Sequence, residues 1–232
     1  MRVLLIADDT TIVAAVEMAF LGESLVLDRA EAGEDALQQA KLYDYDALLV
    51  DLDLRDSDGR AIVRKLRAAQ IDAPILAIAR DGDVDIVVEA LGLGADDCVA
   101  KPFHHRELVA RLRTIVRRAN GHAEPTIRTG KLALDLGGRV ATVAGRLLHL
   151  TRKEYDVLEL LSLRKGRALE KDFFLNHLYD GLDEPEPKIV DVFICHLRKK
   201  LAKATGGEHY IETVWGRGYM MRDPEPCTQA CA

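Results

Sequence analysis

Four charged side chains come directly after short apolar runs of the sequence: Asp8, Asp9, Asp51 and Lys101. Because the carboxyl ends of parallel strands meet at one edge of a sheet, we expect these side chains to lie together in the crevice where such sheets bind ligands. A lysine at that edge can neutralise an anion that is placed on Asp51. The sequence therefore predicts an acidic pocket whose chemistry depends on the charge carried by Asp51.

A second group of charged residues belongs to one helical pattern that starts at Lys188. Its apolar positions recur at helical spacing and form one stripe for burial, made by Val190, Ile194, Leu197 and Leu201. The opposite face carries Asp191, Cys195, His196, Arg198, Lys199 and Lys200. We expect the three consecutive basic residues to contact DNA phosphates in a major groove, and Asp191 and His196 to reach base edges. The alternative interpretation is a solvated helix face without DNA.

The first half of the chain alternates short apolar runs with longer amphipathic stretches. The runs are Val3–Ile6, Ala47–Val50, Ile75–Ile78 and Cys98–Ala100. The helical stretches are 34–42, 61–69, 84–93 and 107–116. Runs that are apolar throughout suit strands buried on both faces of a parallel sheet. The alternation predicts a doubly wound α/β domain over residues 1–118.

The pattern changes at residues 119–125, where a helix-ending Asn-Gly and then a proline predict a linker. Strand-like runs split by glycines follow at 131–134, 139–143 and 147–150. Thr151 and Glu154 have the spacing of a capping box, which predicts the start of a helix. Two further helices and a terminal hairpin follow, at 171–179, 188–202 and 210–221. These elements predict an α+β winged helix-turn-helix domain over 126–223, and we expect residues 224–232 to be a flexible tail.

Composition excludes several classes of protein. With 232 residues, 48% hydrophobic and 30% charged, the chain is long enough for two domains and is typical of globular proteins. No apolar run has the roughly 18 residues that span a bilayer, and four scattered cysteines are too few for a disulfide framework, so we expect a cytoplasmic protein without a membrane partner. Cys227 and Cys231 offer two ligands where zinc needs four. The net charge is −6, yet residues 188–222 hold seven Lys or Arg against three Asp or Glu, which favours a polyanion as partner.

The acidic residues and the Lys101-Pro102 pair on this sheet resemble the receiver domain of bacterial two-component response regulators, which has a flavodoxin-like fold. The resemblance covers residues 1–118. It implies that Asp51 accepts a phosphoryl group from a histidine-phosphorylated donor, with Lys101 in the phosphoryl pocket. It also implies a Mg²⁺ site, because a hard dication prefers oxygen ligands and neutralises the transferring group. The implied metal-site residues are Asp8, Asp9, Asp51 and, through its carbonyl, Asp53.

Four positions depart from the receiver pattern. Ala7 stands where the family has the first of two acids, and Ala79 stands where it has the hydroxyl residue that contacts the phosphoryl group. Cys98 replaces an aromatic residue, and Arg55 replaces a proline that is usual there. Because metal binding, phosphoryl sensing and readout are all affected, we predict weakened Mg²⁺ binding and a protein that works largely independently of phosphorylation.

Several alternatives stay open. Asp51 and Lys101 could be a leftover structural ion pair, or Asp9 could substitute for the missing acid in a conventional switch driven by phosphorylation of Asp51. A metal-dependent phosphohydrolase would need a second metal site and a substrate pocket, for which the sequence offers no residues. We therefore expect no enzyme activity.

The second domain resembles the effector domain of OmpR/PhoB-class response regulators over residues 125–222, most specifically in the wing sequence Gly216-Arg217-Gly218-Tyr219. Other stretches, including 158–166 and 41–46, are similar to the CtrA subfamily of cell-cycle regulators, although that subfamily has lysine at the position of His196. The resemblance implies a sequence-specific transcription regulator of double-stranded DNA, with RNA polymerase as a partner. It leaves open whether a histidine kinase or phosphotransferase is another. We expect Arg217 to enter a minor groove, and Trp215 to be a core or phosphate-packing residue.

Family members dimerise through the face formed by the fourth helix, fifth strand and fifth helix of the receiver. Residues present for cross-subunit ion pairs on that face are Asp96, Asp97, Glu107, Arg111 and Arg113. Val87 occupies a position where the family often has a basic residue. The resemblance therefore implies a homodimer through the receiver, and we predict that it does not depend on phosphorylation.

Overall fold

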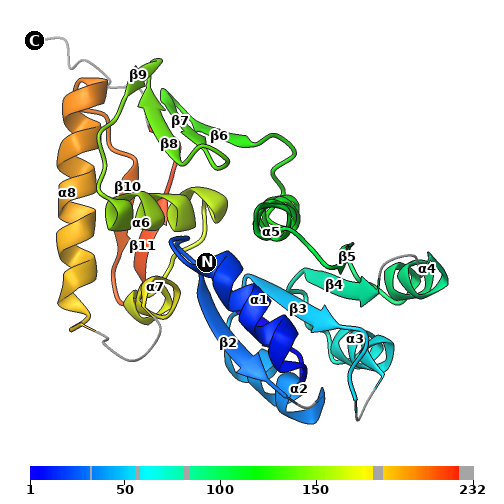
Figure 1. Cartoon of the computed structure of the whole chain (residues 1–232). Helices are drawn as coiled ribbons and strands as arrows, with labels where there is room; N and C mark the ends of the chain where they lie inside the picture. Colours follow the sequence, from blue (N-terminus) through cyan, green and yellow to red (C-terminus); the bar gives the residue numbers. More distant parts are fainter. Residues whose placement is uncertain (32, 56–57, 81–83, 180–184, 225–232) are drawn as a thin grey trace, which may run out of the picture. The chain divides into compact units, whose positions relative to one another are not determined.

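The structure is a computed structural model that describes residues 1–31, 33–55, 58–80, 84–179 and 185–224. The chain forms two compact units, Met1–Gly121 and His122–Ala232 (Figure 1). The division falls inside the expected linker, whereas the expected tail, with Cys227 and Cys231, lies almost entirely outside the described residues. No helix among the described residues is long and apolar enough to cross a membrane.

The first unit is a parallel sheet with strand order β2-β1-β3-β4-β5, and it confirms the predicted doubly wound fold (Figure 1). The strands are β1 (Arg2–Ile6), β2 (Val26–Ala30), β3 (Ala47–Asp51), β4 (Ile75–Arg80) and β5 (Asp97–Lys101). The helices are α1 (Thr10–Phe20), α2 (Gly33–Leu42), α3 (Gly59–Ala68), α4 (Val84–Gly92) and α5 (His105–Ala119).

Successive residues of the central strands point to opposite faces of this sheet, and each face has its own apolar cluster. Leu5 and Leu49 pack with apolar residues of α1 and α5. Leu4 and Leu48 pack on the other face with residues of α2, α3 and α4. Because helices cover both faces, β1, β3 and β4 are buried over most of their length, and a binding site has room only at the strand ends.

The second unit begins with an antiparallel sheet of β6 (Thr126–Thr129), β7 (Leu132–Asp135), β8 (Val140–Val143) and β9 (Arg146–Leu147). Three helices follow, namely α6 (Arg152–Leu163), α7 (Lys171–Leu178) and α8 (Lys188–Thr205). The unit ends in the antiparallel pair β10 (Ile211–Val214) and β11 (Gly218–Met221), which is the wing. A single apolar cluster joins the sheet, the helices and the wing, and the predicted winged helix-turn-helix is confirmed.

Two sequence signals in this unit are visible as contacts. The capping box at the start of α6 is present, because Thr151 Oγ1 accepts from the Glu154 N–H at 3.3 Å and Glu154 Oε2 accepts from the Thr151 N–H at 2.8 Å. The stripe of α8 is buried as predicted, with all four of its residues at most 1% exposed: Val190, Ile194, Leu197 and Leu201. These contacts fix α8 on α6 and leave its opposite face outward.

The wing is held by a close approach of two backbones. A Cβ at Gly218 would lie 1.9 Å from the carbonyl oxygen of Leu169, so only glycine fits there, and its φ of +98° is also in the region that favours glycine. Tyr219 and Leu169 exchange two backbone hydrogen bonds of 2.8 and 2.9 Å. The segment before α7 therefore adds a third backbone to the wing.

Candidate functional site

The carboxylate of Asp51, at the end of β3, is completely buried and is balanced by a cation of the same chain. Lys101 Nζ, from the end of β5, donates to Asp51 Oδ1 at 2.5 Å and to Asp53 Oδ2 at 3.2 Å. Asp53 Oδ1 also accepts from Arg80 at 3.1 Å. The strand ends thus bring Asp51, Asp53 and Lys101 together, and Arg80 is a cation of this pocket that the sequence analysis did not identify.

The two acids after β1 have different partners. Asp8 Oδ2 accepts from the backbone N–H of Arg55 at 2.6 Å, a hydrogen bond that a proline at this position could not donate. Asp9 caps α1 by accepting from the Thr11 N–H at 2.7 Å, and this contact lowers the pKa of Asp9 below its ordinary value. Asp9 is therefore used at the helix start, and Arg55 has a structural partner that explains its departure from the receiver pattern.

The oxygen atoms left for a metal ion in this pocket are few. Asp8 Oδ1 and Asp51 Oδ2 are buried side-chain atoms without a hydrogen-bond partner, so these two oxygens fit a hard dication such as Mg²⁺. Across the described ranges, no group of three His, Cys, Asp or Glu residues could hold a metal ion. Mg²⁺ would thus be held by Asp8 and Asp51, where its charge would neutralise a transferring phosphoryl group.

At the remaining positions that depart from the receiver pattern, the side chain is apolar or weakly polar. Ala7 and Ala79 are buried, at 3% and 0% exposure, and present methyl groups at the ends of β1 and β4. Cys98 lies on β5 beside Ala77 of β4, and burial together with the nearby Asp97 raises the pKa of its thiol. No side-chain hydroxyl stands at position 79 to bind a phosphoryl group on Asp51.

The charged residues expected at the dimer face have partners within their own unit. Arg111 pairs with Asp97 and with Glu107, each at 2.9 Å, and both pairs raise the pKa of Arg111. These three side chains stay about one third to one half exposed, so a second copy could reach them.

Asp96 and Arg113, the other two residues, pair with Arg67 at 2.8 Å and with Glu23 at 2.5 Å. Asp96 also accepts from the Ile75 N–H at 2.7 Å, so it fixes the start of β4. On α4, exposed apolar side chains recur at helical spacing: Val84, Val88 and Leu91. The two ion pairs are formed within the unit, whereas this apolar stripe is exposed to solvent in the described part of the chain.

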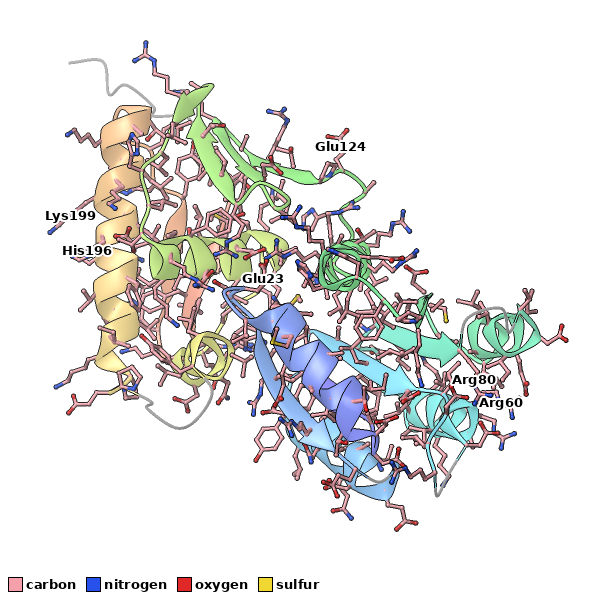
Figure 2. The ribbon with its side chains drawn as sticks, viewed as in Figure 1. Glu23, Arg60, Arg80, Glu124, His196 and Lys199 are labelled. Carbon is pink, nitrogen blue, oxygen red and sulfur yellow. The ribbon has the colours of Figure 1, made fainter. Side chains whose placement is uncertain are left out.

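The outward face of α8 is the candidate DNA-reading surface. Its exposed residues are Lys188, Val192, Cys195, His196, Lys199 and Lys203. His196 and Lys199 project away from the body of the unit in Figure 2. Lys188, Val192 and Lys203 were not identified from the sequence, although their spacing opposite the buried stripe was a usable signal. Three lysines, an imidazole and an apolar side chain give this face groups for phosphates, base edges and thymine methyl groups.

Two of the residues expected to contact phosphates bind other parts of the unit. Arg198 donates from Nε to the Ile211 carbonyl at 3.0 Å and from Nη2 to Thr213 Oγ1 at 2.9 Å, so it joins α8 to the wing. Lys200 donates to Glu154 Oε2 at 2.6 Å and to the His149 carbonyl at 3.0 Å. Both side chains are only partly exposed, and Lys199 is the exposed member of the three consecutive basic residues.

Asp191 and His196 were expected to reach base edges, and the structure gives them different surroundings. Asp191 accepts from Lys171 at 2.7 Å and from the Tyr219 hydroxyl at 2.6 Å, and these hydrogen bonds lower its pKa. His196 is 53% exposed, with Nδ1 3.6 Å from Glu154 Oε1. Asp191 therefore serves to join α8, α7 and the wing, while His196 presents its ring to solvent.

The tip of the wing carries two exposed side chains, Trp215 and Arg217. Arg217 is exposed at this tip, and its entry into a minor groove stays a prediction. Trp215 is 91% exposed, which excludes the core and leaves phosphate packing as the remaining expectation for this residue. Its position in a turn, rather than on a strand face, removes it from the core.

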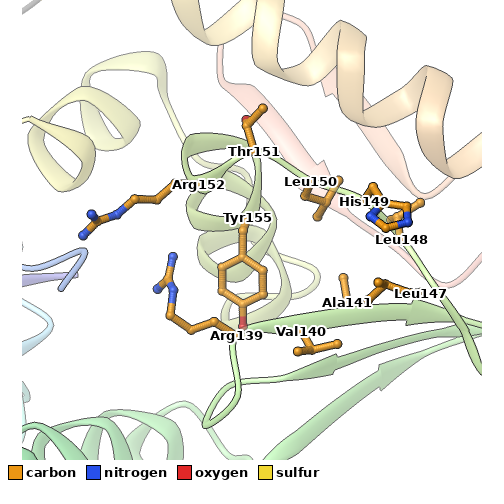
Figure 3. A pocket seen from close by; sticks show the side chains of 10 residues that line it. All are labelled: Arg139, Val140, Ala141, Leu147, Leu148, His149, Leu150, Thr151, Arg152 and Tyr155. Carbon is orange, nitrogen blue, oxygen red and sulfur yellow. The ribbon is translucent and has the colours of Figure 1, made fainter. Parts of the chain in front are cut away.

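A hollow of about 300 Å³ lies between the sheet and the start of α6 (Figure 3). Arg139 lies over the Tyr155 ring, 4.5 Å from its centroid, and pairs with Asp156. The charged lining residues, Arg139 and Arg152, are both cationic. The polar lining residues besides these two arginines are His149, Thr151 and Tyr155.

Comparison with known proteins identifies both units. Residues 3–113 match the family described as "Response regulator receiver domain", and residues 145–221 match "Transcriptional regulatory protein, C terminal". The cell cycle response regulators CtrA of Brucella ovis and of Brucella anthropi are each 51% identical over 225 residues, which are 97% of this chain and 97% of each relative. DrrB, a Thermotoga maritima OmpR/PhoB homologue, is 25% identical and covers 95% of this chain and 98% of its own, with a TM-score of 0.45. The chain belongs to the OmpR/PhoB-type response regulators, in which a receiver domain is joined to a DNA-binding transcriptional regulatory domain, and it is similar over its length to CtrA.

Proposed function

We propose that this DNA-binding regulator controls transcription largely independently of phosphorylation. The observation that carries the proposal is the pairing of buried Asp51 with Lys101 at 2.5 Å, beside the methyl group of Ala79. A phosphoryl group on Asp51 would find no hydroxyl at position 79, and a ligand shifts an equilibrium only through contacts that differ between two states. Attachment of phosphate would therefore change the receiver little.

The test compares DNA affinity with and without a phosphodonor. Wild-type protein and Asp51→Asn are each treated with acetyl phosphate and Mg²⁺ and titrated into a duplex that the wild-type protein has enriched from a random-sequence pool. We expect all four affinities to agree within about twofold. A severalfold increase that occurs in the wild-type protein and is absent in Asp51→Asn would contradict the proposal and establish a conventional switch.

We further propose that the regulator acts as a homodimer through the α4–β5–α5 face of the receiver. Support comes from the exposed stripe of Val84, Val88 and Leu91, next to the half-exposed cluster of Arg111 with its two acids. Apolar side chains exposed in a row are typical of an interaction surface. Sedimentation at tens of micromolar should show a dimer, and Val88→Asp should yield a monomer; a strict wild-type monomer would contradict the proposal.

A second candidate function is a conventional regulator that is switched by Mg²⁺-dependent phosphorylation of Asp51. It is favoured by one observation, the two unpartnered oxygens Asp8 Oδ1 and Asp51 Oδ2, which leave part of a metal site in place. Mg²⁺ titration monitored by the midpoint of thermal unfolding distinguishes the candidates. A rise at millimolar Mg²⁺ that Asp8→Asn abolishes supports the switch, whereas no rise supports phosphorylation independence.

The proposed function also implies binding partners and a cellular location. We propose double-stranded DNA as the ligand of α8 and Arg217, RNA polymerase as the partner in transcription, and the cytoplasm as the location. A histidine kinase or phosphotransferase is a partner only under the second candidate function. Lys199 supplies phosphate affinity, and His196 supplies base choice. No catalytic activity is proposed.

A further inference from the structure

His196 lies on the outward face of α8, and a buried carboxylate lies behind it. Its side chain is 53% exposed, and its Nδ1 is 3.6 Å from Oε1 of Glu154, a side chain of α6 that is only 3% exposed. In Figure 2 the side chains of His196 and Lys199 both project away from the unit. One nitrogen of the ring thus faces an acid of the same unit, and the other, Nε2, belongs to the exposed part of the ring.

The carboxylate determines which ring nitrogen carries a proton. A neutral imidazole has one donor and one acceptor nitrogen, whereas a protonated imidazole has two donors. Because the negative charge of Glu154 lies next to Nδ1, a proton on Nδ1 is favoured in both forms. Nε2 is then an acceptor in the neutral ring and a donor in the protonated ring. A single proton therefore reverses the hydrogen-bonding character of the exposed nitrogen.

Glu154 keeps its negative charge over the whole range in which histidine titrates. Burial alone would raise the pKa of Glu154, but the hydrogen bonds from Lys200 and Thr151 outweigh burial, so this pKa lies below the ordinary value of 4.5. Histidine side chains change their charge between about pH 5 and 8. Glu154 is thus a fixed charge, and His196 is the group beside it that titrates.

Two other titratable side chains lie close to His196 in the chain or at the start of α6. Cys195 precedes it on α8 and is exposed, and thiols titrate above the range of histidine. His149 is exposed just before α6, and its backbone carbonyl accepts from Lys200 at 3.0 Å. Lysines keep their charge throughout this range. Cys195 and His149 are therefore the neighbours that need control variants.

The charged residues on the other elements packed against α8 are mostly bound to groups other than His196. The ion pairs on α6, on α7 and in the wing are Asp156–Arg139, Glu159–Arg139, Lys171–Asp191 and Glu212–Arg222. Lys153 of α6 binds the Leu178 carbonyl, and His177 of α7 is buried and stacked on Phe173. The exposed charges at the starts of these helices are Arg152 and Asp172. Strand β8 carries no charged residue.

We propose that a single proton on His196 changes the base that α8 prefers in the major groove. With Nε2 as an acceptor, the ring suits the amino groups that adenine and cytosine present there. With Nε2 as a donor, it suits the acceptor atoms of guanine and thymine. The lysine that the CtrA subfamily has at this position is a donor at every pH of this range, so the histidine makes base choice depend on the proton concentration. The inference rests on DNA binding by the second unit.

The two forms of the ring set the direction of the pH dependence. A duplex with an acceptor base at the contacted position needs the protonated ring, so its affinity should be highest at the low end of the histidine range and fall as pH rises. A duplex with an amino group at that position should gain relative to it. Because binding and protonation favour one another, the acceptor duplex should take up protons when it binds.

The experiment enriches duplexes from a random-sequence pool with the full-length chain, at about pH 6 and at about pH 8. We expect the two enriched sets to differ at the base pair contacted by His196, with an acceptor base at the lower pH. The ratio of the affinities for the two duplexes should change about fivefold between these pH values, which is the effect of one hydrogen bond. His196→Lys should enrich the low-pH set at both values.

Two control variants and a second measurement assign the effect to one ring. Cys195→Ser and His149→Gln change the titratable neighbours and should keep the wild-type dependence on pH. Titration calorimetry in two buffers of different ionisation enthalpy measures the protons taken up on binding. On the low-pH duplex, the wild-type protein should take up more protons than His196→Lys does.

Three outcomes would overturn the inference while DNA binding stands: identical enriched sets at both pH values, equal proton uptake by the wild-type protein and His196→Lys, or a pH-dependent base choice that persists in His196→Lys. If the wild-type protein enriches no duplex at either pH, DNA binding itself is wrong.

Discussion

Lys200 of α8 donates to the buried carboxylate of Glu154 at 2.6 Å, so a residue expected to contact DNA phosphates binds a buried group of its own unit. Glu154 also belongs to the capping box that starts α6. One carboxylate therefore fixes the start of one helix and the position of another.

The first prediction separates Lys199 from Lys200. Lys199→Ala should weaken binding to every duplex, because it removes one phosphate contact. The slope of log affinity against log salt concentration should become shallower by about one unit. Its free energy of unfolding should stay within about 0.5 kcal/mol of wild type, since the residue is exposed. Lys200→Ala should instead lower the free energy of unfolding by about 1–3 kcal/mol, because Glu154 loses its cation. Salt-dependent titrations and urea unfolding measure both; equal effects of the two variants would contradict the assignment.

The second prediction concerns stability at low pH. Burial alone would raise the pKa of Glu154, but the hydrogen bonds from Lys200 and Thr151 outweigh it, so its pKa lies below the ordinary value of 4.5. A carboxyl with a lowered pKa in the folded state contributes stability above its unfolded pKa and loses it as pH falls through the folded pKa. Unfolding free energy should therefore decrease below about pH 4.5, and Glu154→Gln should make the decrease shallower. Denaturant titrations at several pH values check this, with Glu159→Gln as a control on the same helix.

The third prediction is a change of sequence preference at His196. This imidazole is half exposed on the outward face of α8, where it can donate or accept at a base edge. His196→Ala should alter which duplexes are enriched from a random pool and leave affinity for bulk DNA within about twofold. His196→Lys is the informative second variant, because it restores the residue usual in the CtrA subfamily. Identical enriched sequences for all three proteins would remove His196 from base reading.

The fourth prediction concerns the base of the wing. Gly218→Ala places a methyl group against the Leu169 carbonyl, where the separation would be 1.9 Å, and the two strands must move apart. We expect a loss of about 2–4 kcal/mol in the free energy of unfolding. Gly216→Ala, at a position with open space around it, should cost about 1–2 kcal/mol through its positive φ alone. Similar losses in both variants would mean that the Leu169 contact is unimportant.

Apolar runs and helical spacing predicted the central strands and the buried stripe of α8, because burial on both faces or along one stripe leaves a direct pattern in the sequence. The edge strand β2 has buried residues only at its two ends, and the short apolar run Leu25–Leu27 at its start is followed by Asp28 and Arg29, so the strand was not predicted. The strand expected at 147–150 is limited to β9, since only Arg146 and Leu147 pair with β8.

The candidate sites were harder to predict than the fold. Strand ends placed Asp51 and Lys101 correctly, but the contact of Arg55 with Asp8 depends on a backbone N–H, which no residue type encodes. Likewise, helical spacing placed Arg198 near the outward face of α8. Its hydrogen-bond partners, Ile211 and Thr213, lie 13 and 15 residues further along the chain. Side chains that bind distant segments cannot be told from free ones by spacing.

Arg198 has a consequence for the kind of duplex that the protein accepts. Its guanidinium holds β10 against α8 by two hydrogen bonds, so the spacing between the elements proposed for two adjacent grooves is set inside the protein. A duplex must then match that fixed spacing through its own helical twist and groove width. We therefore expect overwound or underwound DNA of the same base sequence to bind less tightly than relaxed DNA.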